Sequence, residues 1–419
     1  MTASGVRSAV GSFTDGPPAA PTTVGGGRSL RRPGLVLAGA TSALPLMTFT
    51  VTGFSIVCLL VGVCVVRGWT RREFAIPVLF CAAGSAAYLV STLVNETSLT
   101  AINVPAFPAI ALYLAGIAVL TRGIDDLVAL LAGAAVGTVV FYLAFGTTLT
   151  VQAGYADVWK YGLAPSITAL VLIVVARGGC GHQRWGCVAL VGLAGVSIAL
   201  NFRSHALICL AAAILVTVDG LRRRPLPLPA KAAFCLVLGM GSSVALTAAA
   251  RSGLLGTALT EKVDMQAAQQ VPAILAGRTE PPLSLTAIAH RPILGWGDAN
   301  TLPATVFDDA YQLAFRWGFD LSYPLPSLWR SADGVVSLHS ILLGSWAEAG
   351  IVAAAVSVWL IVCAVTLVSR AHRVTAYAPL LMFLGLQALW DLLFSPWSYN
   401  LPLVFALVVA FAVRLRALT

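Results

Sequence analysis

The sequence predicts an all-α polytopic membrane protein with about twelve transmembrane helices and one large external loop that contains short helices. Of its 419 residues, 58% are hydrophobic and only 10% are charged, whereas about 25% of a soluble protein is charged. Apolar segments of roughly 15–20 residues recur along nearly the whole chain, as bilayer-spanning helices require. In hydrocarbon the backbone must satisfy its own hydrogen bonds, so these segments are predicted to be helices. One long stretch of mixed polarity, residues 251–338, interrupts them.

Residues 1–33 precede the first apolar segment and are rich in Gly, Ala, Pro, Ser and Thr. This composition predicts a disordered tail, and the arginines at its end place it in the cytoplasm. A cleavable signal peptide is not predicted, because the apolar stretch that begins near Gly34 is too long and further spans follow it.

The predicted spans form an N-terminal bundle of about nine helices in residues 34–250 and a C-terminal set of about three in residues 339–419. The first two are one apolar run, broken near Pro45 and Gly53. The twelve spans are 34–48, 51–66, 74–93, 104–121, 126–145, 161–176, 186–200, 206–219, 231–250, 347–368, 376–394 and 400–415.

Basic residues fall in alternate loops, which the positive-inside rule assigns to the cytoplasm. Because Arg32 and Arg67 both belong there, the run between them must cross twice or dip in and return. Both termini are therefore expected in the cytoplasm of a protein of the cytoplasmic membrane. The net charge of +9 is explained by these loops and does not indicate a nucleic-acid partner. The basic residues are Arg31, Arg32, Arg67, Arg71, Arg72, Arg122, Arg177, Arg184, Arg222, Arg223, Arg224, Lys231, Arg370, Arg373, Arg414 and Arg416.

The eight cysteines do not indicate a metal site or a disulfide framework. Six lie inside apolar spans, where Cys acts as a small hydrophobe. Cys180 and Cys187 flank a short basic loop with His182, but these ligands are too few for a zinc site. No metal and no cofactor are expected, and the large loop, which has no Cys, contains no disulfide.

The large loop is predicted to fold into short interfacial helices joined by turns at Pro281-Pro282, Pro324 and Pro326. Aromatic side chains are favoured at the membrane–water interface, so its aromatic residues are expected against the bilayer surface. These residues are Trp296, Phe307, Trp317, Phe319 and Trp329.

Two arginines on the predicted external side are candidate anion ligands. Arg203 lies in a tight turn between two spans, where the positive-inside rule disfavours it, and Arg278 lies in the middle of the large loop. Arginine suits phosphate because its planar fork donates in parallel to two oxygens. The alternatives are an Arg203 that reaches lipid headgroups or caps the preceding helix, and an Arg278 that is a solvated surface charge or pairs with Glu280.

His339 is the candidate general base, at the expected start of the helix that leads into span ten. A helix N-terminus disfavours an added positive charge, so the ring should be able to accept a proton from a hydroxyl. The alternatives are that His339 caps the helix or lies in the interfacial belt of the membrane. Glu348 should lie on the opposite face and pair inside the bundle, whereas Asp391 should have an Arg or His partner. His205 and His290 show no partner in the sequence.

Four segments, in order, resemble motifs of the O-antigen ligase and O-antigen polymerase superfamily. They are the arginine turn Asn201–Leu207, the pair Gly277-Arg278, the Pro-apolar-apolar-Gly-x-Gly run within 291–297, and the His-to-Glu-x-Gly run 339–351. The resemblance covers roughly residues 186–365. Phe202, Ser204 and Ser340 depart from the family pattern, which has Ser, Gly and Asn there.

The resemblance implies a metal-independent, inverting glycosyltransferase. Such enzymes move a glycan from a polyprenyl-diphosphate carrier to an acceptor hydroxyl, on a glycan or glycolipid, at the outer face of the cytoplasmic membrane. By the same resemblance Arg203 and Arg278 would bind the donor diphosphate and His339 would activate the acceptor.

Two other functions are possible from the sequence. A flippase or transporter of a lipid-linked glycan would more often show charged or broken spans near the bilayer midplane, whereas the unusual polar groups here gather at one face. A membrane glycosyltransferase of the C-superfamily would have acidic residues in its first external loop, where this chain has only Glu96.

Overall fold

The computed structural model describes residues 31–47, 50–65, 72–101, 103–145, 155–179, 181–222, 224–252, 264, 271, 277–320, 323–331, 334–336, 338–398 and 400–418. Most of the predicted tail therefore lies outside the described residues. Its last three residues, from Arg31 to Pro33, are instead the first turn of helix α1.

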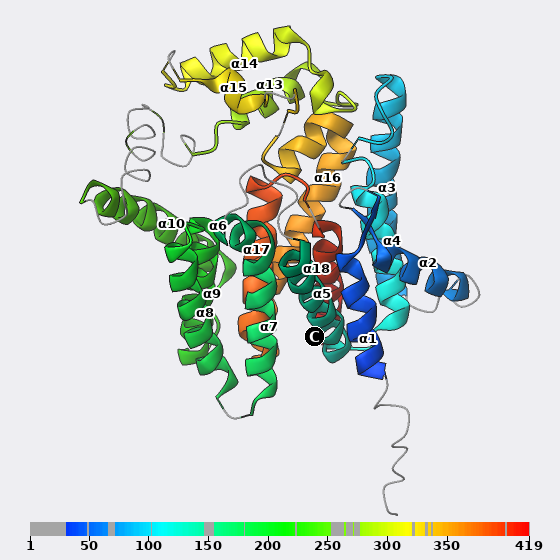
Figure 1. Ribbon diagram of the computed structural model, residues 1–419, viewed down its shortest axis with the longest axis vertical. Helices are drawn as coiled ribbons and strands as arrows, with labels where there is room; N and C mark the ends of the chain where they lie inside the picture. The colour runs from blue at the N-terminus through cyan, green and yellow to red at the C-terminus, as the bar shows by residue number, and fades with distance from the viewer. Residues whose placement is uncertain are drawn as a thin grey trace, which may run out of the picture.

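The described chain is almost entirely helical, which confirms the predicted all-α membrane-type fold (Figure 1). Within the described residues, six helical segments are long and apolar enough to cross a membrane, and three shorter apolar helices accompany them. Eleven of the twelve predicted spans coincide with helices to within a few residues, and the predicted span 51–66 is α2 (Gly53–Val65). The other ten helices are α3 (Arg72–Val94), α4 (Ala106–Leu120), α5 (Ile124–Phe145), α7 (Ala164–Arg177), α8 (His182–Ala199), α9 (Arg203–Leu221), α10 (Leu228–Arg251), α16 (Ile341–Arg370), α17 (Ala378–Phe394) and α18 (Leu401–Arg416).

The predicted helical span 34–48 is wrong. Helix α1 (Arg31–Ala40) ends after ten residues, and the chain continues as an antiparallel hairpin of β1 (Pro45–Met47) and β2 (Val51–Thr52) before α2 (Gly53–Val65). The breaks expected near Pro45 and Gly53 are confirmed as the two ends of this hairpin. The Tyr113 hydroxyl of α4 donates to Thr50 O at 2.9 Å and so holds the hairpin against the bundle.

Helix α1 is held by close packing against α5. A Cβ at Gly133 would lie 1.9 Å from the carbonyl oxygen of Val36, so only glycine admits the two backbones at this separation. Gly133 and Gly137 form the small-xxx-small pattern that membrane helices use for such contacts. The short α1 thereby joins the bundle core although it is about 15 Å long, half the hydrocarbon thickness.

The described residues between 277 and 336, called the loop domain below, fold over one end of the helical bundle (Figure 1). They form α13 (Pro281–His290), α14 (Ala304–Arg316) and α15 (Leu325–Trp329), so the predicted short helices are confirmed. Pro281-Pro282 opens α13 rather than forming a turn, because Pro fits the first helical positions.

The loop domain has its own hydrophobic core, and this corrects the expectation that its aromatic residues face the bilayer. Phe319 and Trp329 are 2% and 1% exposed, buried among the side chains of α13, α14 and α15. Trp296, Phe307 and Trp317 pack against the same core. Burial inside a folded unit removes the aromatic surface from water without a membrane.

The loop domain is attached to α16 where that helix is broken. Gly350 has φ 73° and ψ −169°, which interrupts the helix and leaves the carbonyls before it without intrahelical donors. Trp296 N donates to Ala347 O at 2.9 Å and Gly297 N donates to Glu348 O at 2.8 Å. Two of the motifs that carry the family resemblance therefore pair through their main chains; this pairing is called the clasp below.

The opposite end of the bundle carries the ion pairs of the basic loops. Arg31 binds Asp126 at 3.0 Å, and Lys231, which is 1% exposed, binds Asp219 at 2.6 Å and donates to Val368 O near the end of α16. The start of α1 and the C-terminus lie at this end, away from the loop domain (Figure 1). The ion pairs of Arg31 and Lys231 and the loop domain thus lie at opposite ends of the protein.

We expect Gly350→Ala to lower the free energy of unfolding by about 2 kcal/mol or more, because this backbone conformation is nearly exclusive to glycine. A Cβ at this position would also lie 1.8 Å from Ile293 O. Thermal melting of the detergent-solubilised protein measures the loss. Gly344→Ala in the same helix is the control: its Cβ would meet atoms no closer than 3.6 Å, so an equal loss there would contradict the role of Gly350.

Candidate active site

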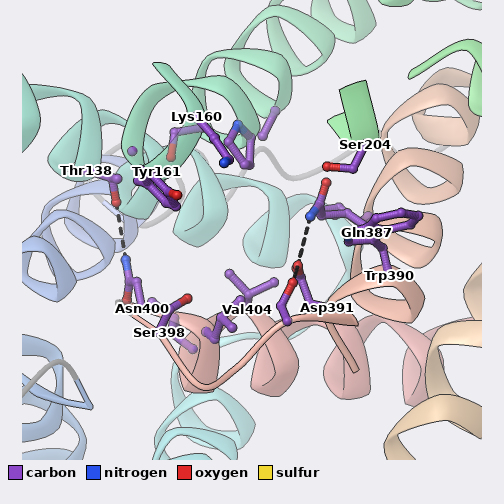
Figure 2. A pocket seen from close by; sticks show the side chains of 18 of the residues that line it. Thr138, Lys160, Tyr161, Ser204, Gln387, Trp390, Asp391, Ser398, Asn400 and Val404 are labelled. Atoms are coloured by element: carbon purple, nitrogen blue, oxygen red, sulfur yellow. Dashed lines mark hydrogen bonds between the residues drawn. The ribbon is translucent and has the colours of Figure 1, made fainter. Parts of the chain in front are cut away.

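A cavity of about 370 Å³ lies between the helical bundle and the loop domain. Its size is at the lower end of the range for small-molecule sites, about 300–1,000 Å³. Its walls come from α5, α7, α17 and the start of α18, and Figure 2 shows some of the polar side chains that face it, among them Lys160, Gln387 and Asn400. The polar and charged residues that line it are Thr138, Lys160, Tyr161, Ser166, Ser204, Arg278, His339, Gln387, Asp391, Ser395, Ser398 and Asn400.

His339 lines this cavity just before the first turn of α16. Ser340 is the N-cap of that helix, and its hydroxyl accepts from Leu343 N at 3.2 Å, so the capping alternative belongs to Ser340 and not to His339. The predicted position of His339 at a helix start is confirmed. Its side chain is 34% exposed, and no described residue bonds to Nε2, which leaves this nitrogen available to a ligand.

Glu280 is the carboxylate partner of His339. Its Oε1 lies 2.8 Å from His339 Nδ1, close enough for an ion pair, although the ring N–H is not aligned for a hydrogen bond. Burial by itself raises the pKa of Glu280, but His339 and the charge of Arg278 outweigh it, and the net shift of the pKa is downward. Trp329 Nε1 donates to Thr279 O at 2.7 Å and so fixes this segment on the loop-domain core.

Arg278 lines the cavity beside this pair. Its guanidinium lies over the ring of Trp390 at 5.9 Å and forms no ion pair with a described carboxylate, so the alternative in which Glu280 neutralises it is not observed. Burial lowers the pKa of Arg278, while the nearby charges of Glu280 and Asp391 act in the opposite direction. A half-buried guanidinium without an ion-pair partner is suited to an anionic ligand.

Arg203 lies at the edge of the cavity rather than in its wall. It is the first residue of α9, between Phe202 and Ser204, which both line the cavity. Its Nε donates to Asn201 Oδ1 at 3.3 Å, and Asn201 has φ 56° in the predicted tight turn. The structure therefore brings Arg278 and His339 together and leaves Arg203 beside them.

A turn of π-helix adds a cation that the sequence did not single out. Residues Trp159–Leu163 form it between α6 (Tyr155–Val158) and α7, and it turns Lys160 and Tyr161 toward the cavity (Figure 2). Such π-turns occur often at functional sites. Lys160 has no ion-pair partner among the described carboxylates and lies 4.8 Å from the ring of Tyr161.

Asp391 lines the cavity from α17. The prediction that its partner is an Arg or a His is wrong, because its hydrogen bonds come from an amide and a hydroxyl. Its carboxylate accepts from Gln387 Nε2 at 3.1 Å and from Ser395 Oγ at 3.1 Å, both on its own stretch of chain. Because residues three and four apart share a helix face, these partners were readable from the sequence spacing.

The remaining acidic and histidine candidates are structural. Glu348 is buried away from His339, and accepts from Tyr88, Asn103 and the main-chain N–H of Ala299, as expected for an acid paired inside the bundle. His205 and His290 do have partners: Ser197 and Thr168 flank the buried ring of His205, and His290 binds Asp309 at 2.9 Å.

Neither a metal site nor a similarity to known proteins identifies the function of this cavity. Among the residues that the structure describes, no three His, Cys, Asp or Glu side chains are grouped to hold a metal ion; Cys180 lies outside them. Comparison with known protein families and with curated protein sequences finds no match to this chain.

We expect Glu280→Gln to lower the melting temperature at neutral pH and to have little effect in acid. The pKa of Glu280 in the folded protein lies below its ordinary value of 4.5, so its stabilising contribution is complete above that pH and is lost as the pH falls through the lower folded value. Melting curves of both proteins between pH 7 and pH 3 measure the difference.

Asp309→Asn is the matched control for Glu280→Gln, since it removes a solvent-exposed carboxylate from a histidine of the same loop domain. Exposed pairs contribute little, so its melting temperature should stay near that of the wild type throughout. A Glu280→Gln difference that grew as the pH fell would contradict the downward shift.

Proposed function

We propose that the protein is a membrane glycosyltransferase, which transfers a glycan from a polyprenyl-diphosphate carrier to an acceptor hydroxyl at the outer face of the cytoplasmic membrane. The observation that carries the proposal is that Arg278 and His339 line one cavity, with the carboxylate of Glu280 2.8 Å from Nδ1 of the His339 ring. A cation without an ion-pair partner and an imidazole beside a carboxylate are the two groups that this reaction needs, one for the leaving diphosphate and one for the acceptor.

The donor diphosphate binds at the cationic side of the cavity in this proposal. Arg278 donates to it from the loop domain, Lys160 from the π-helical turn, and Arg203 from the rim once its weak bond to Asn201 is released. Fixed donors in a site that excludes water stabilise the charge that develops on the leaving diphosphate. The diphosphate needs such groups at headgroup depth, because its prenyl chain keeps it in the membrane.

His339 acts as the general base. The negative charge of Glu280, 2.8 Å from Nδ1, favours the tautomer that carries its proton on Nδ1, and Nε2 is then able to accept a proton. Nε2 removes the proton from the acceptor hydroxyl as that oxygen bonds to the anomeric carbon from the face opposite the diphosphate, and the C–O bond to the diphosphate breaks. The configuration at the anomeric carbon is inverted, and no metal takes part.

The proposed topology has about twelve membrane-inserted segments, both termini in the cytoplasm and the loop domain outside. It is supported by the ion pairs of Arg31 and Lys231 at the end of the bundle away from the loop domain. Helices α1 and α2, with 10 and 13 residues, are the pair that dips in and returns, since each is shorter than a full crossing.

We expect His339→Ala to reduce transfer by about 10²–10⁴-fold, the usual contribution of a general base. In cells, the surface glycan is lost and the lipid-linked donor accumulates on the outer leaflet. His290→Ala, on the surface of the same loop domain, is the control and should leave transfer unchanged. Donor that stays on the inner leaflet when the gene is deleted would instead identify a flippase.

We expect Arg278→Lys to reduce transfer by about ten-fold or more although the charge is kept, because an ammonium cannot donate to two phosphate oxygens in parallel. Transfer by the purified protein from a polyprenyl-diphosphate-linked glycan measures the effect. Arg203→Lys should give a loss of the same kind. Arg316→Lys, at an exposed position on α14, is the control, and full activity of the first two variants would remove both arginines from the site.

A further inference from the structure

Two side-chain amides in the cavity wall have a buried oxygen with no hydrogen-bond partner. Gln387 is 8% exposed and Asn400 is 9% exposed, and both line the cavity. Neither Gln387 Oε1 nor Asn400 Oδ1 accepts a hydrogen bond from a described residue. An unsatisfied buried acceptor is costly, so a built site with two of them requires an explanation.

The orientation of the Gln387 amide is set by its neighbour. Its Nε2 lies 3.1 Å from each carboxylate oxygen of Asp391. Because carboxylate oxygens accept hydrogen bonds, the nitrogen must face Asp391 and the oxygen must point away. Figure 2 shows this amide with its nitrogen on the dashed contact to Asp391 and its oxygen on the side of Ser204.

The orientation of the Asn400 amide follows from the hydroxyl beside it. Thr138 Oγ1 already donates to Ala134 O at 2.9 Å, so it can only accept from Asn400, whose Nδ2 lies 3.2 Å away. The nitrogen also contacts Ser42 Oγ at 3.2 Å. Asn400 is locked further by its left-handed backbone, with φ 64° at the N-cap of α18.

We propose that Gln387, Asn400 and Asp391 form a subsite for a sugar ring, in which Gln387 Oε1 and Asn400 Oδ1 accept hydrogen bonds from ring hydroxyls. This inference rests on the proposed transferase function and identifies the part of the cavity that binds the sugar. All three groups present acceptor oxygens, and a sugar ring presents several hydroxyl donors around one small body.

The position of the subsite matches a sugar next to a diphosphate. Trp390 is on the same helix as Gln387 and Asp391, lines the cavity and lies beneath the guanidinium of Arg278. A sugar held by these side chains would have its anomeric oxygen near Arg278. A site built to bond a hydroxyl also rejects a sugar that lacks it, because the amide oxygen is then left unpaired.

The test uses the purified full-length protein and two probes, undecaprenyl diphosphate and the same lipid linked to one glucose residue. Two neutral hydrogen bonds correspond to a preference of about ten-fold or more for the glucose-bearing lipid in equilibrium binding. Gln387→Leu and Asn400→Gly should each reduce this preference several-fold and leave binding of the bare lipid unchanged. Glycine keeps the left-handed backbone at position 400.

Two further variants separate the subsite from general effects. Asn400→Asp keeps an acceptor oxygen and should retain more of the preference than Asn400→Gly. Ser357→Ala removes a buried hydroxyl that also lacks a described partner but lies outside the cavity, and it should change neither affinity. Binding of the bare lipid reports that each variant is folded.

A second arm identifies the source of the sugar. If both lipids bind equally but Gln387→Leu weakens binding of a soluble glucose disaccharide to the protein loaded with bare lipid, the subsite holds the acceptor sugar, and the inference stands. If no sugar-bearing probe distinguishes wild type from Gln387→Leu and Asn400→Gly, the subsite is refuted while the diphosphate site stands. Wild-type protein that binds neither lipid refutes the proposed function as well.

Discussion

The clasp between the loop domain and the break in α16 is the interaction on which the rest of the site depends. A broken helix leaves carbonyls that must be satisfied in a buried place, and the main-chain N–H groups of Trp296 and Gly297 satisfy two of them. The break needs Gly350, since its backbone conformation and the approach of Ile293 O both exclude a Cβ. Glu348 adds a side-chain bond to Ala299 N from the same helix turn.

The clasp also explains why the loop and the bundle share a cavity. The indole of Trp296 donates to Ala287 O of α13, while its main chain bonds to α16, so one residue ties the two helices together. Helix α13 starts just after Glu280, and α16 starts just after His339. Fixing the two helix starts side by side brings the carboxylate to the imidazole.

The cavity divides its polar groups by charge. Cations stand on the loop domain and the π-helical turn, whereas acceptor oxygens stand on α17 and at the start of α18. A sugar phosphate has a negatively charged group, which suits the cations, and hydroxyl donors, which suit the acceptor oxygens.

The sequence by itself determined the helical membrane-type class, the position of most helices and the choice of Arg278 and His339 as candidates, since hydropathy, charge placement and local motifs are short-range signals. It failed where long-range contacts decide the outcome. Only the tertiary structure showed the hairpin after α1, the burial of aromatic side chains inside the loop domain and the position of Arg203 at the rim of the cavity. It also showed that Glu280 lies beside His339 and that Lys160 lines the cavity. Glu280 and His339 are 59 positions apart in the chain. Their proximity depends on main-chain hydrogen bonds formed elsewhere, such as the one from Gly297 to Glu348, and no sequence periodicity predicts such a contact.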